Sequence, residues 1–385
     1  MFEGCLQSMA YYLTAKGYTA DKDGWRLEPA PGAPIPMRCH GQVTPESKNL
    51  SYEVFVTDER HDLLTADVLC TVDGVKAFLA EGVRLRLVPD WPLKTLPHVE
   101  PKQVASHDNF QFGYQSLLAA ALGKPSEAFG PSHEVFDSDR RSLRVPAPPY
   151  HFMSRVSEID GPQNGLRIGT AATAEYDAPA DAWYFAEHNG TTPFGVLMEV
   201  ALQPCGWLAS YADCSLTSET DLLFRNVDGT GTLHRTITAR TRTITTRTTL
   251  TRLSKSAGMV IVGFELHADA DGERVFDLKT VFGYFPQEAF ENQVGLPPTD
   301  DERAALEAPC EVHEDIPKSM LTMIDRVTGY WPEGGARRLG RLRSEKDVDP
   351  DEWFFKAHFF QDPVQPGSLG VEAMIQLLKY FCVRK

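Results

Sequence analysis

One block of eight residues occurs twice in this chain, and this repeat restricts the possible fold more than any other feature. DAWYFAEH (181–188) and DEWFFKAH (351–358) lie 170 residues apart and share Trp, a second aromatic residue, Phe and His. The similarity continues before the block, in 152–161 and 321–329, and after it, in 198–203 and 371–376. Because motif, order and spacing recur together, we interpret the chain as copies of one structural unit.

A third copy of the segment after the block opens the chain. Glu3 and Gln7 have the same acid-x-x-x-Gln spacing as Glu199 and Gln203, each pair inside an apolar stretch. A β-rich region follows both acids, and an Asp-Gly pair lies 70 residues after Glu3 and 72 residues after Glu199. The chain therefore begins with the back half of a unit.

Each unit has the pattern of one apolar helix followed by several strands. In the last copy, one face of the predicted helix carries Val371, Met374, Ile375, Leu378 and Phe381. The strands are predicted from the alternation of β-branched residues. A long helix wrapped by an antiparallel sheet is an α+β architecture, present here in tandem copies.

The boundaries of the copies follow from these patterns and from the composition of the linkers. We predict the back part of a first unit, a connector, a complete second unit, a linker rich in Pro and acidic residues, and the front part of a third unit, at residues 1–96, 97–145, 146–290, 291–310 and 311–385, respectively. Since both outer units are partial, we interpret the sequence as an internal piece of a longer polypeptide.

The composition argues against several classes of function. No apolar run approaches the roughly 18 residues of a membrane span, and the N-terminus lacks a signal-peptide pattern, so we expect a cytoplasmic protein without a membrane partner. The seven cysteines are scattered, which argues against a metal site. The net charge of −15 disfavours nucleic acid. The Thr/Arg run at 236–253, which a nucleic-acid surface would also explain, we interpret as a strand pair with one exposed face.

A histidine, a Pro-Gly turn and an acid-bearing helix follow one another in 353–376. Histidine accepts a proton near neutral pH, and a glutamate in an apolar pocket has a raised pKa and stays protonated. Backbone N–H groups at a helix N-terminus stabilise negative charge on a carbonyl oxygen. Together, a base, an acid and oxyanion donors suit removal of an α-proton and loss of a β-hydroxyl. Taken singly, each element also has a structural explanation: a packed histidine, a surface turn or a solvated glutamate.

The segment HFFQDPVQPGSLGVEAMIQLL (358–378) resembles the active-site segment of β-hydroxyacyl-thioester dehydratases of the hot-dog fold, of the β-hydroxydecanoyl type. The wider arrangement is similar to the tandem dehydratase region of bacterial polyunsaturated fatty acid synthases, which are polyketide-synthase-like proteins. The resemblance implies tandem hot-dog folds, no cofactor, and an acyl carrier protein whose phosphopantetheine arm holds the substrate. It also implies dehydration of 3-hydroxyacyl to trans-2-enoyl thioesters, which some members follow with isomerisation to the cis-3 position.

The resemblance also implies roles for individual residues of the third unit. His358 would be the general base, and Glu372 the acid that protonates the departing hydroxyl. Gly367, which follows Pro366, would offer its N–H to the thioester carbonyl. Gln376 would steady the acid or a bound water.

The second unit matches this pattern less well. His188 and Glu199 are in register as base and acid, and Gln203 stands in the place of the steadying glutamine. The segment between base and acid is three residues shorter, however, and Phe194 replaces the glycine of the turn. The contact to the carbonyl oxygen is therefore in doubt for this copy.

In the family, the base and the acid come from two paired copies. Pairing of the first and second units would place His188 against Glu3, with Gln7 one helical turn further on, and would leave Glu199 without a histidine. The third unit would then pair with a copy beyond Lys385, so we expect this chain to be impaired as a dehydratase. Two alternatives remain open: non-catalytic acyl-binding or scaffolding copies, and a hot-dog thioesterase.

Overall fold

The computed structural model divides into two compact units, Met1–Pro101 and Lys102–Lys385. The structure describes residues 1–20, 25–32, 34–60, 63–88, 102–108, 110–163, 165–216, 218–256, 258–291, 295–310 and 312–384. Within those residues, no helix is both long enough and apolar enough to cross a membrane.

The first unit consists of one helix on an antiparallel sheet. The helix is α1 (Phe2–Ala15), and the strands are β1 (Arg26–Pro29), β2 (Met37–Cys39), β3 (Leu50–Arg60), β4 (Leu63–Val72) and β5 (Val75–Val88). The strand order is β1-β5-β4-β3, and β2 also pairs with β5. Helix α1 buries Cys5, Leu6, Met9 and Leu13 against this sheet. This is the expected back half, an apolar helix followed by strands.

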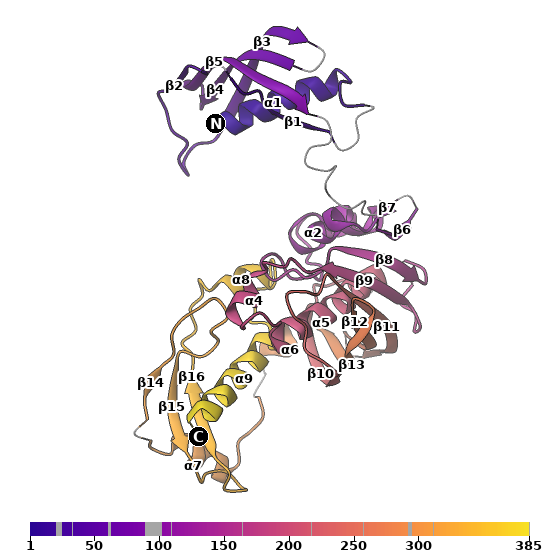
Figure 1. Ribbon diagram of the computed structural model, residues 1–385. Helices are drawn as coiled ribbons and strands as arrows, with labels where there is room; N and C mark the ends of the chain where they lie inside the picture. Colours follow the sequence, from indigo (N-terminus) through magenta and orange to yellow (C-terminus); the bar gives the residue numbers. More distant parts are fainter. Residues whose placement is uncertain are drawn as a thin grey trace. The chain divides into compact units, whose positions relative to one another are not determined.

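The second unit contains a complete copy of the same arrangement. Its strands are β8 (Arg155–Asp160), β9 (Ala171–Asp177), β10 (Leu223–Leu233), β11 (Thr243–Ser256), β12 (Met259–Ala270) and β13 (Glu273–Phe285), in the order β10-β13-β12-β11-β9-β8. The long helix α5 (Phe194–Tyr211) packs on this sheet (Figure 1), and fifteen of its eighteen residues are buried. The curled sheet wraps this apolar helix, which is the hot-dog arrangement. The predicted fold class is therefore confirmed.

Two hairpins show the repeat in atomic detail. Asp73–Gly74 joins β4 to β5, and Asp271–Gly272 joins β12 to β13. The aspartates have φ of 49° and 50°, and the glycines 84° and 85°, as a two-residue turn with positive φ at both positions requires. Each aspartate carboxylate also accepts hydrogen bonds from two backbone N–H groups just before or at the start of another strand of its sheet. The same two-residue turn and the same pair of aspartate hydrogen bonds thus occur in both sheets.

A connector precedes the complete copy, and a partial third copy follows it. The connector contains β6 (Ser106–His107), β7 (Phe110–Gln111), α2 (Tyr114–Leu122), α3 (Pro125–Phe129) and the 3-10 helix Pro131–Phe136. Helices α6 (Glu288–Glu291) and α7 (Asp300–Glu307) precede the third copy, which contains β14 (Glu314–Asp315), β15 (Arg326–Trp331), β16 (Arg341–Glu345), α8 (Trp353–Ala357) and α9 (Gly367–Arg384). Helices α8 and α9 are the counterparts of α4 (Trp183–Glu187) and α5. Met374 and Leu378 of α9 are exposed, in contrast to the buried α5.

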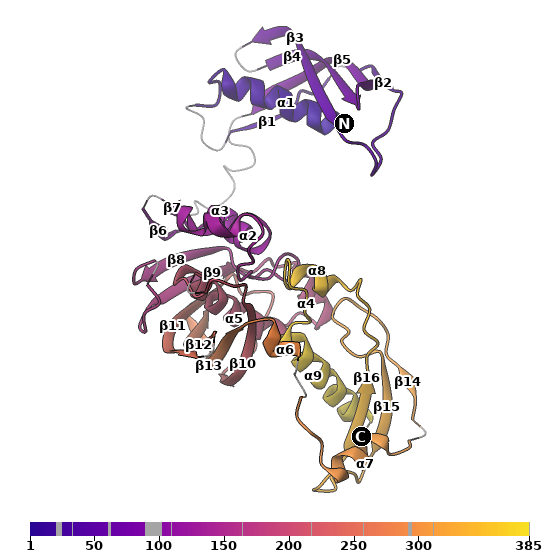
Figure 2. The same cartoon turned by 180° about the vertical axis from the view of Figure 1, so that it is seen from behind.

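Helices α5 and α9 pack against each other, so the second and third copies form a pair. They approach closely at Gly195, where an added Cβ would lie 2.7 Å from the Ser368 carbonyl oxygen. Figure 2 shows the two helices meeting between the sheet of the second copy and the strands of the third. The expectation that the third copy pairs only beyond Lys385 is therefore wrong. Helix α9 can pack closely on α5 because Gly195 has no side chain at the point of contact.

The Thr/Arg run forms one strand, where a strand pair was expected. Strand β11 begins at Thr243, and the preceding residues form a loop. In that loop Ile237 is buried, its carbonyl accepts the Thr192 N–H at 2.9 Å, and Thr238 bridges to Thr191. The burial of Ile237 and these backbone bonds hold the loop against the residues just before α5. The alternation of β-branched residues in the sequence does not reveal such a contact.

Candidate active site

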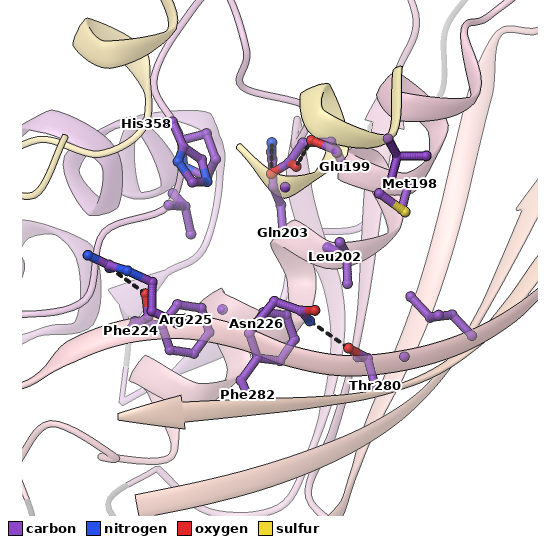
Figure 3. A pocket seen from close by; sticks show the side chains of 18 of the residues that line it. Met198, Glu199, Leu202, Gln203, Phe224, Arg225, Asn226, Thr280, Phe282 and His358 are labelled. Atoms are coloured by element: carbon purple, nitrogen blue, oxygen red, sulfur yellow. Dashed lines mark hydrogen bonds between the residues drawn. The ribbon is translucent and has the colours of Figure 1, made fainter. Parts of the chain in front are cut away.

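A cavity of about 560 Å³ lies where the second and third copies meet. One wall is the face of α5 that carries Phe194, Met198 and Leu202, the three α5 residues that are not fully buried. Strands β10 and β13 form the opposite wall, and the turn after α8 closes one end. His358 of the third copy and Glu199 of the second enter this same space from different parts of the ribbon (Figure 3).

His358 is arranged as a neutral base. Its Nδ1–H donates to the Val364 carbonyl oxygen at 3.0 Å, because a carbonyl can only accept a hydrogen bond. The Nε2 atom therefore carries the lone pair. Burial lowers the pKa of His358 to about 4, so the imidazole is uncharged at neutral pH. The turn thus fixes the tautomer of the ring, and burial keeps the ring uncharged.

Glu199 is arranged as an acid. Desolvation raises the pKa of Glu199 to about 7, against the lowering effect of hydrogen bonds from Ser368 and Gln203. Ser368 Oγ donates to Oε2 at 2.8 Å, and Gln203 Nε2 approaches Oε1 at 3.4 Å. The carboxyl therefore exchanges its proton near neutral pH, as a general acid must.

Gln203 holds the acid-bearing helix to the chain that leads into β8. Its Oε1 accepts the Phe152 N–H and its Nε2 donates to the Tyr150 carbonyl, both at 2.8 Å. With the contact to Glu199, the two amide hydrogens are both engaged. Gln203 lines the cavity, but in this arrangement its amide positions the acid.

Gln376 makes the same set of bonds in the third copy. Its Oε1 accepts the Met323 N–H at 2.9 Å, and its Nε2 donates to the Leu321 carbonyl at 2.8 Å and to Glu372 Oε1 at 3.1 Å. The predicted role of this glutamine in steadying the acid agrees with these contacts. A role of either glutamine in binding substrate stays a prediction.

The Pro-Gly turn brings a helix N-terminus to the cavity. The Pro366 carbonyl accepts the N–H groups of Leu369 and Gly370 in the first turn of α9. Gly367 is the first residue of α9, so the helix contains no carbonyl four residues earlier to accept its N–H. This N–H is therefore available as a donor. Gly367 lines the cavity, and a Cβ added there meets no atom within 4 Å. Gly367 therefore lines the same cavity as His358, and its role as an oxyanion donor stays a prediction.

An ion pair ties this turn to the sheet of the second copy. Arg225 of β10 donates to both oxygens of Asp362, at 2.6 and 2.9 Å, and both side chains are about three-quarters buried. Asp362 also exchanges backbone hydrogen bonds with Phe359, the residue after His358. A strand of one copy thus holds the turn that carries His358 of the other.

The pairing also brings His188 and Glu372 together at a second, corresponding site. Both residues line a smaller pocket of about 280 Å³. Lys379 occupies it: its Nζ donates to His188 Nε2 at 2.7 Å and lies 3.8 Å from Glu372 Oε1. His188 Nδ1–H donates to Thr191 Oγ1 at 2.7 Å, so both ring nitrogens are engaged. Burial and the neighbouring Lys379 lower the pKa of His188.

These contacts correct the expected pairing of acids and bases. Glu199 does not lack a histidine, since His358 shares its cavity, and the acid that shares a pocket with His188 is Glu372. Glu3 and Gln7, expected opposite His188, are exposed on α1, where Gln7 Nε2 donates to Glu3 Oε1 at 3.3 Å. The cause is the packing of α5 on α9, which order along the chain does not determine.

Five residues of these two sites were not identified from the sequence. Tyr150 and Ser368 contact the acid network, Arg225 and Asp362 fix the turn, and Lys379 occupies the second pocket. The repeat contained one signal for three of them. At the corresponding positions the two copies differ, with Tyr150 against Leu321, Ser368 against Gly195, and Lys379 against Gly206.

Comparison with known proteins supports the resemblance. Residues 1–81 and 316–385 match a family described as the FabA-like domain. The chain is 32% identical over 308 residues to one of the subunits of a polyunsaturated fatty acid synthase from a Thraustochytrium species, an alignment that covers 68% of this chain. The chain spans about a fifth of that relative's length, since the alignment covers 20% of it.

Two solved structures illustrate the range of similar folds. A dehydratase heterocomplex from Xenorhabdus doucetiae aligns with 38% of this chain and 92% of its own, at 12% identity and a TM-score of 0.29. A hypothetical thioesterase from Streptococcus pneumoniae, solved with coenzyme A, aligns with 33% and 86%, at 10% identity and a TM-score of 0.25. The chain is thus related to part of a polyunsaturated fatty acid synthase and carries two stretches of FabA-like hot-dog domain sequence.

Proposed function

We propose that the second and third copies dehydrate 3-hydroxyacyl thioesters to trans-2-enoyl thioesters, with His358 as base and Glu199 as acid. The observation that supports this most is that both residues line one cavity, one from each copy. A neutral imidazole and a carboxyl that holds a proton near pH 7 are the protonation states that water loss requires.

In the proposed reaction His358 Nε2 takes the proton from the carbon next to the thioester carbonyl. The electron pair of that C–H bond forms the new double bond, while the bond from the β-carbon to the hydroxyl oxygen breaks. Glu199 gives its proton to this oxygen, which leaves as water. The N–H of Gly367 donates to the carbonyl oxygen, on which negative charge develops. Return of the proton from the imidazolium to the carboxylate completes the cycle.

The remainder of the cavity suits an acyl chain. Apolar side chains dominate the walls between α5 and β13, among them Met198, Leu202, Phe276, Leu278 and Phe282. An aliphatic chain is stabilised there by about 0.8 kcal/mol for each buried CH₂ group. We propose that an acyl carrier protein presents the chain through a phosphopantetheine arm. The relation to a fatty acid synthase supports that carrier.

For the His188 and Glu372 site we propose a non-catalytic state. A base needs a free lone pair, and Lys379 donates to His188 Nε2. Phe194 also takes the place that Gly367 has in the first site, so the turn that presents a free glycine N–H is missing. This applies the alternative of a non-catalytic copy to one site of the pair.

The test uses the 385-residue chain and a 3-hydroxydecanoyl pantetheine thioester. We expect Glu199→Gln to lower kcat by about 10²-fold or more, since removal of a general acid has effects of that size. The matched control, Glu372→Gln, removes the acid of the other site and should stay close to wild type. Loss of water with the thioester intact supports the proposal. Release of free acid would support thioester hydrolysis instead, and no turnover by the wild-type chain would contradict the proposal.

A further inference from the structure

The two acids of the pair have different surroundings, although the copies hold them in the same way. Gln203 and Gln376 make matching bonds to the chain that leads into the first strand and to their own acid. The frame around Glu199 and Glu372 is therefore the same. The glutamine bonds that both copies share are enough to hold each acid in place. A contact that only one acid makes is therefore an addition to this shared arrangement.

Glu199 has such a contact, and the residues that make it come from different parts of the chain. Ser368 in the first turn of α9 donates to Glu199 Oε2 at 2.8 Å. The phenol oxygen of Tyr150 lies 3.0 Å from Ser368 Oγ. Ser368 has one hydrogen, which the carboxyl accepts, so the Tyr150 hydroxyl is the donor in the second bond. Tyr150 and Ser368 are 0% and 2% exposed, so no solvent replaces either bond.

Glu372 lacks both partners. Gly195 stands at the position of Ser368 and has no side chain, and Leu321 stands at the position of Tyr150. Glu372 is 1% exposed, and its Oε2 is buried without a hydrogen-bond partner among the described residues. Leaving a buried carboxyl oxygen without a donor is unfavourable, because the hydrogen bonds that it would make with water are not replaced. Glu199 thus has a chain of hydroxyl groups that Glu372 lacks, whereas Glu372 has the Lys379 ammonium group 3.8 Å from its Oε1.

Packing explains why only one acid can have this chain. The two helices meet where Gly195 faces Ser368, and a Cβ at Gly195 would lie 2.7 Å from the Ser368 carbonyl oxygen. The space between the helices therefore holds one serine side chain. Two identical copies would both have serine or both have glycine, so this asymmetry depends on the divergence of the tandem copies.

We propose that Tyr150 and Ser368 are positioning residues that orient the carboxyl of Glu199 and keep it as the working acid of the pair. With Oε2 held by Ser368, the proton given to the substrate is carried by the other oxygen, Oε1. This inference rests on the proposed dehydration, but it concerns which residues make one of two similar acids competent.

The inference predicts a shift in the pH dependence of catalysis. The hydrogen bond from Ser368 lowers the pKa of Glu199 against the effect of burial, so its removal raises this pKa further above 7. An acid acts in its protonated form, so activity falls as pH rises through the pKa. The descending limb of the profile therefore moves to higher pH in Ser368→Ala. The other titratable groups that line the cavity or touch this network are Tyr150, Arg144, Arg225, His358 and, on α9, Glu372.

The experiment compares pH profiles of kcat for Ser368→Ala, Tyr150→Phe and wild type, with the pantetheine thioester above. We expect the alkaline limb to move up by about one unit in Ser368→Ala, since a hydrogen bond to a charged group is worth that much. Tyr150→Phe should move it in the same direction by less. Both should lower kcat more than they change KM, and Ser368→Thr, which keeps the hydroxyl, should restore the limb.

The control is Tyr184→Phe, which removes a buried phenol hydroxyl that pairs with Tyr176 outside the cavity. Its limb should match wild type. A wild-type limb in both Ser368→Ala and Tyr150→Phe would overturn the inference while leaving the dehydration intact. The pH dependence of unfolding also reports the pKa of Glu199 without turnover, so an inactive chain would still test the network. In that measurement, a pH dependence of unfolding in Ser368→Ala that matches wild type would also overturn the inference.

Discussion

The ion pair between Arg225 and Asp362 gives a quantitative prediction, because it joins the sheet of one copy to the turn that carries the base of the other. Both side chains are about three-quarters buried, at 24% and 23% exposure, and the contact is bidentate. Pairs at the surface contribute about 0–1 kcal/mol and breaking buried ones costs about 3–5 kcal/mol. We therefore expect a coupling of about 1–2 kcal/mol, which corresponds to roughly 5–30-fold in kcat/KM.

The assay is a double-mutant cycle of Arg225→Met, Asp362→Asn and the combined variant, with kcat and KM measured separately. Loosening of the turn displaces Val364, whose carbonyl orients the His358 ring, so kcat should fall more than KM rises. The pH profile of kcat also predicts a direction of shift for each substitution. Burial is the main cause of the low pKa of His358, while Arg225 lowers this pKa and Asp362 raises it.

A base acts when it is neutral, so activity falls as pH drops through the pKa of His358. Arg225→Met should therefore move the acid limb to higher pH, and Asp362→Asn should move it to lower pH. Additive effects of the two substitutions, or limbs that shift in the same direction, would refute the reasoning that the pair positions the base.

Three further predictions follow from the same cavity. Gly229 on β10 lines the cavity, and a Cβ there makes only ordinary contacts, the nearest at 3.5 Å. Gly229→Leu should therefore fold and shift kcat/KM toward shorter acyl chains. An unchanged chain-length profile would show that this wall does not contact the substrate. Glu199 binds its proton more tightly when folded, with a pKa of about 7, so its stabilising effect is complete below the unfolded pKa and lost as pH rises toward 7. Relative to wild type, Glu199→Gln should therefore gain up to about 3 kcal/mol of unfolding free energy between pH 4.5 and 7.5, and a pH-independent difference in chemical denaturation would contradict this. Lys379→Met should release His188 Nε2 and raise the pKa of His188, measured by NMR titration, because a neighbouring positive charge is removed; an unchanged titration would show that the contact is not formed in solution.

The sequence predicted the elements of the fold, because each rests on local physics. The Asp-Gly pairs at 73–74 and 271–272, whose equal spacing indicated the repeat, both form hairpins, since two adjacent positive φ values favour those residues. The helix after each repeated block is visible from its apolar spacing. The Thr/Arg run was misread because the loop before Thr243 is held by the burial of Ile237, a tertiary contact.

The pairing of the copies was not predictable in the same way. It depends on the contact of Gly195 with the Ser368 carbonyl, between two residues 173 positions apart, and no pattern along the chain reports such a contact. Consequently His358 and Glu199 were each identified from the sequence but were assigned to different partners. The sequence did signal that the two sites are unequal, through the shorter segment before Glu199, Phe194 in place of the turn glycine, and differences such as Lys379 against Gly206.

The central claim is that His358, and not His188, is the base of the pair. Its most direct test is the rate of water loss from a 3-hydroxyacyl pantetheine thioester by His358→Ala and by His188→Ala in the 385-residue chain. We predict that His358→Ala loses about 10²-fold or more in kcat and that His188→Ala stays within about threefold of wild type. Equal losses in the two variants, or a greater loss in His188→Ala, would contradict the claim.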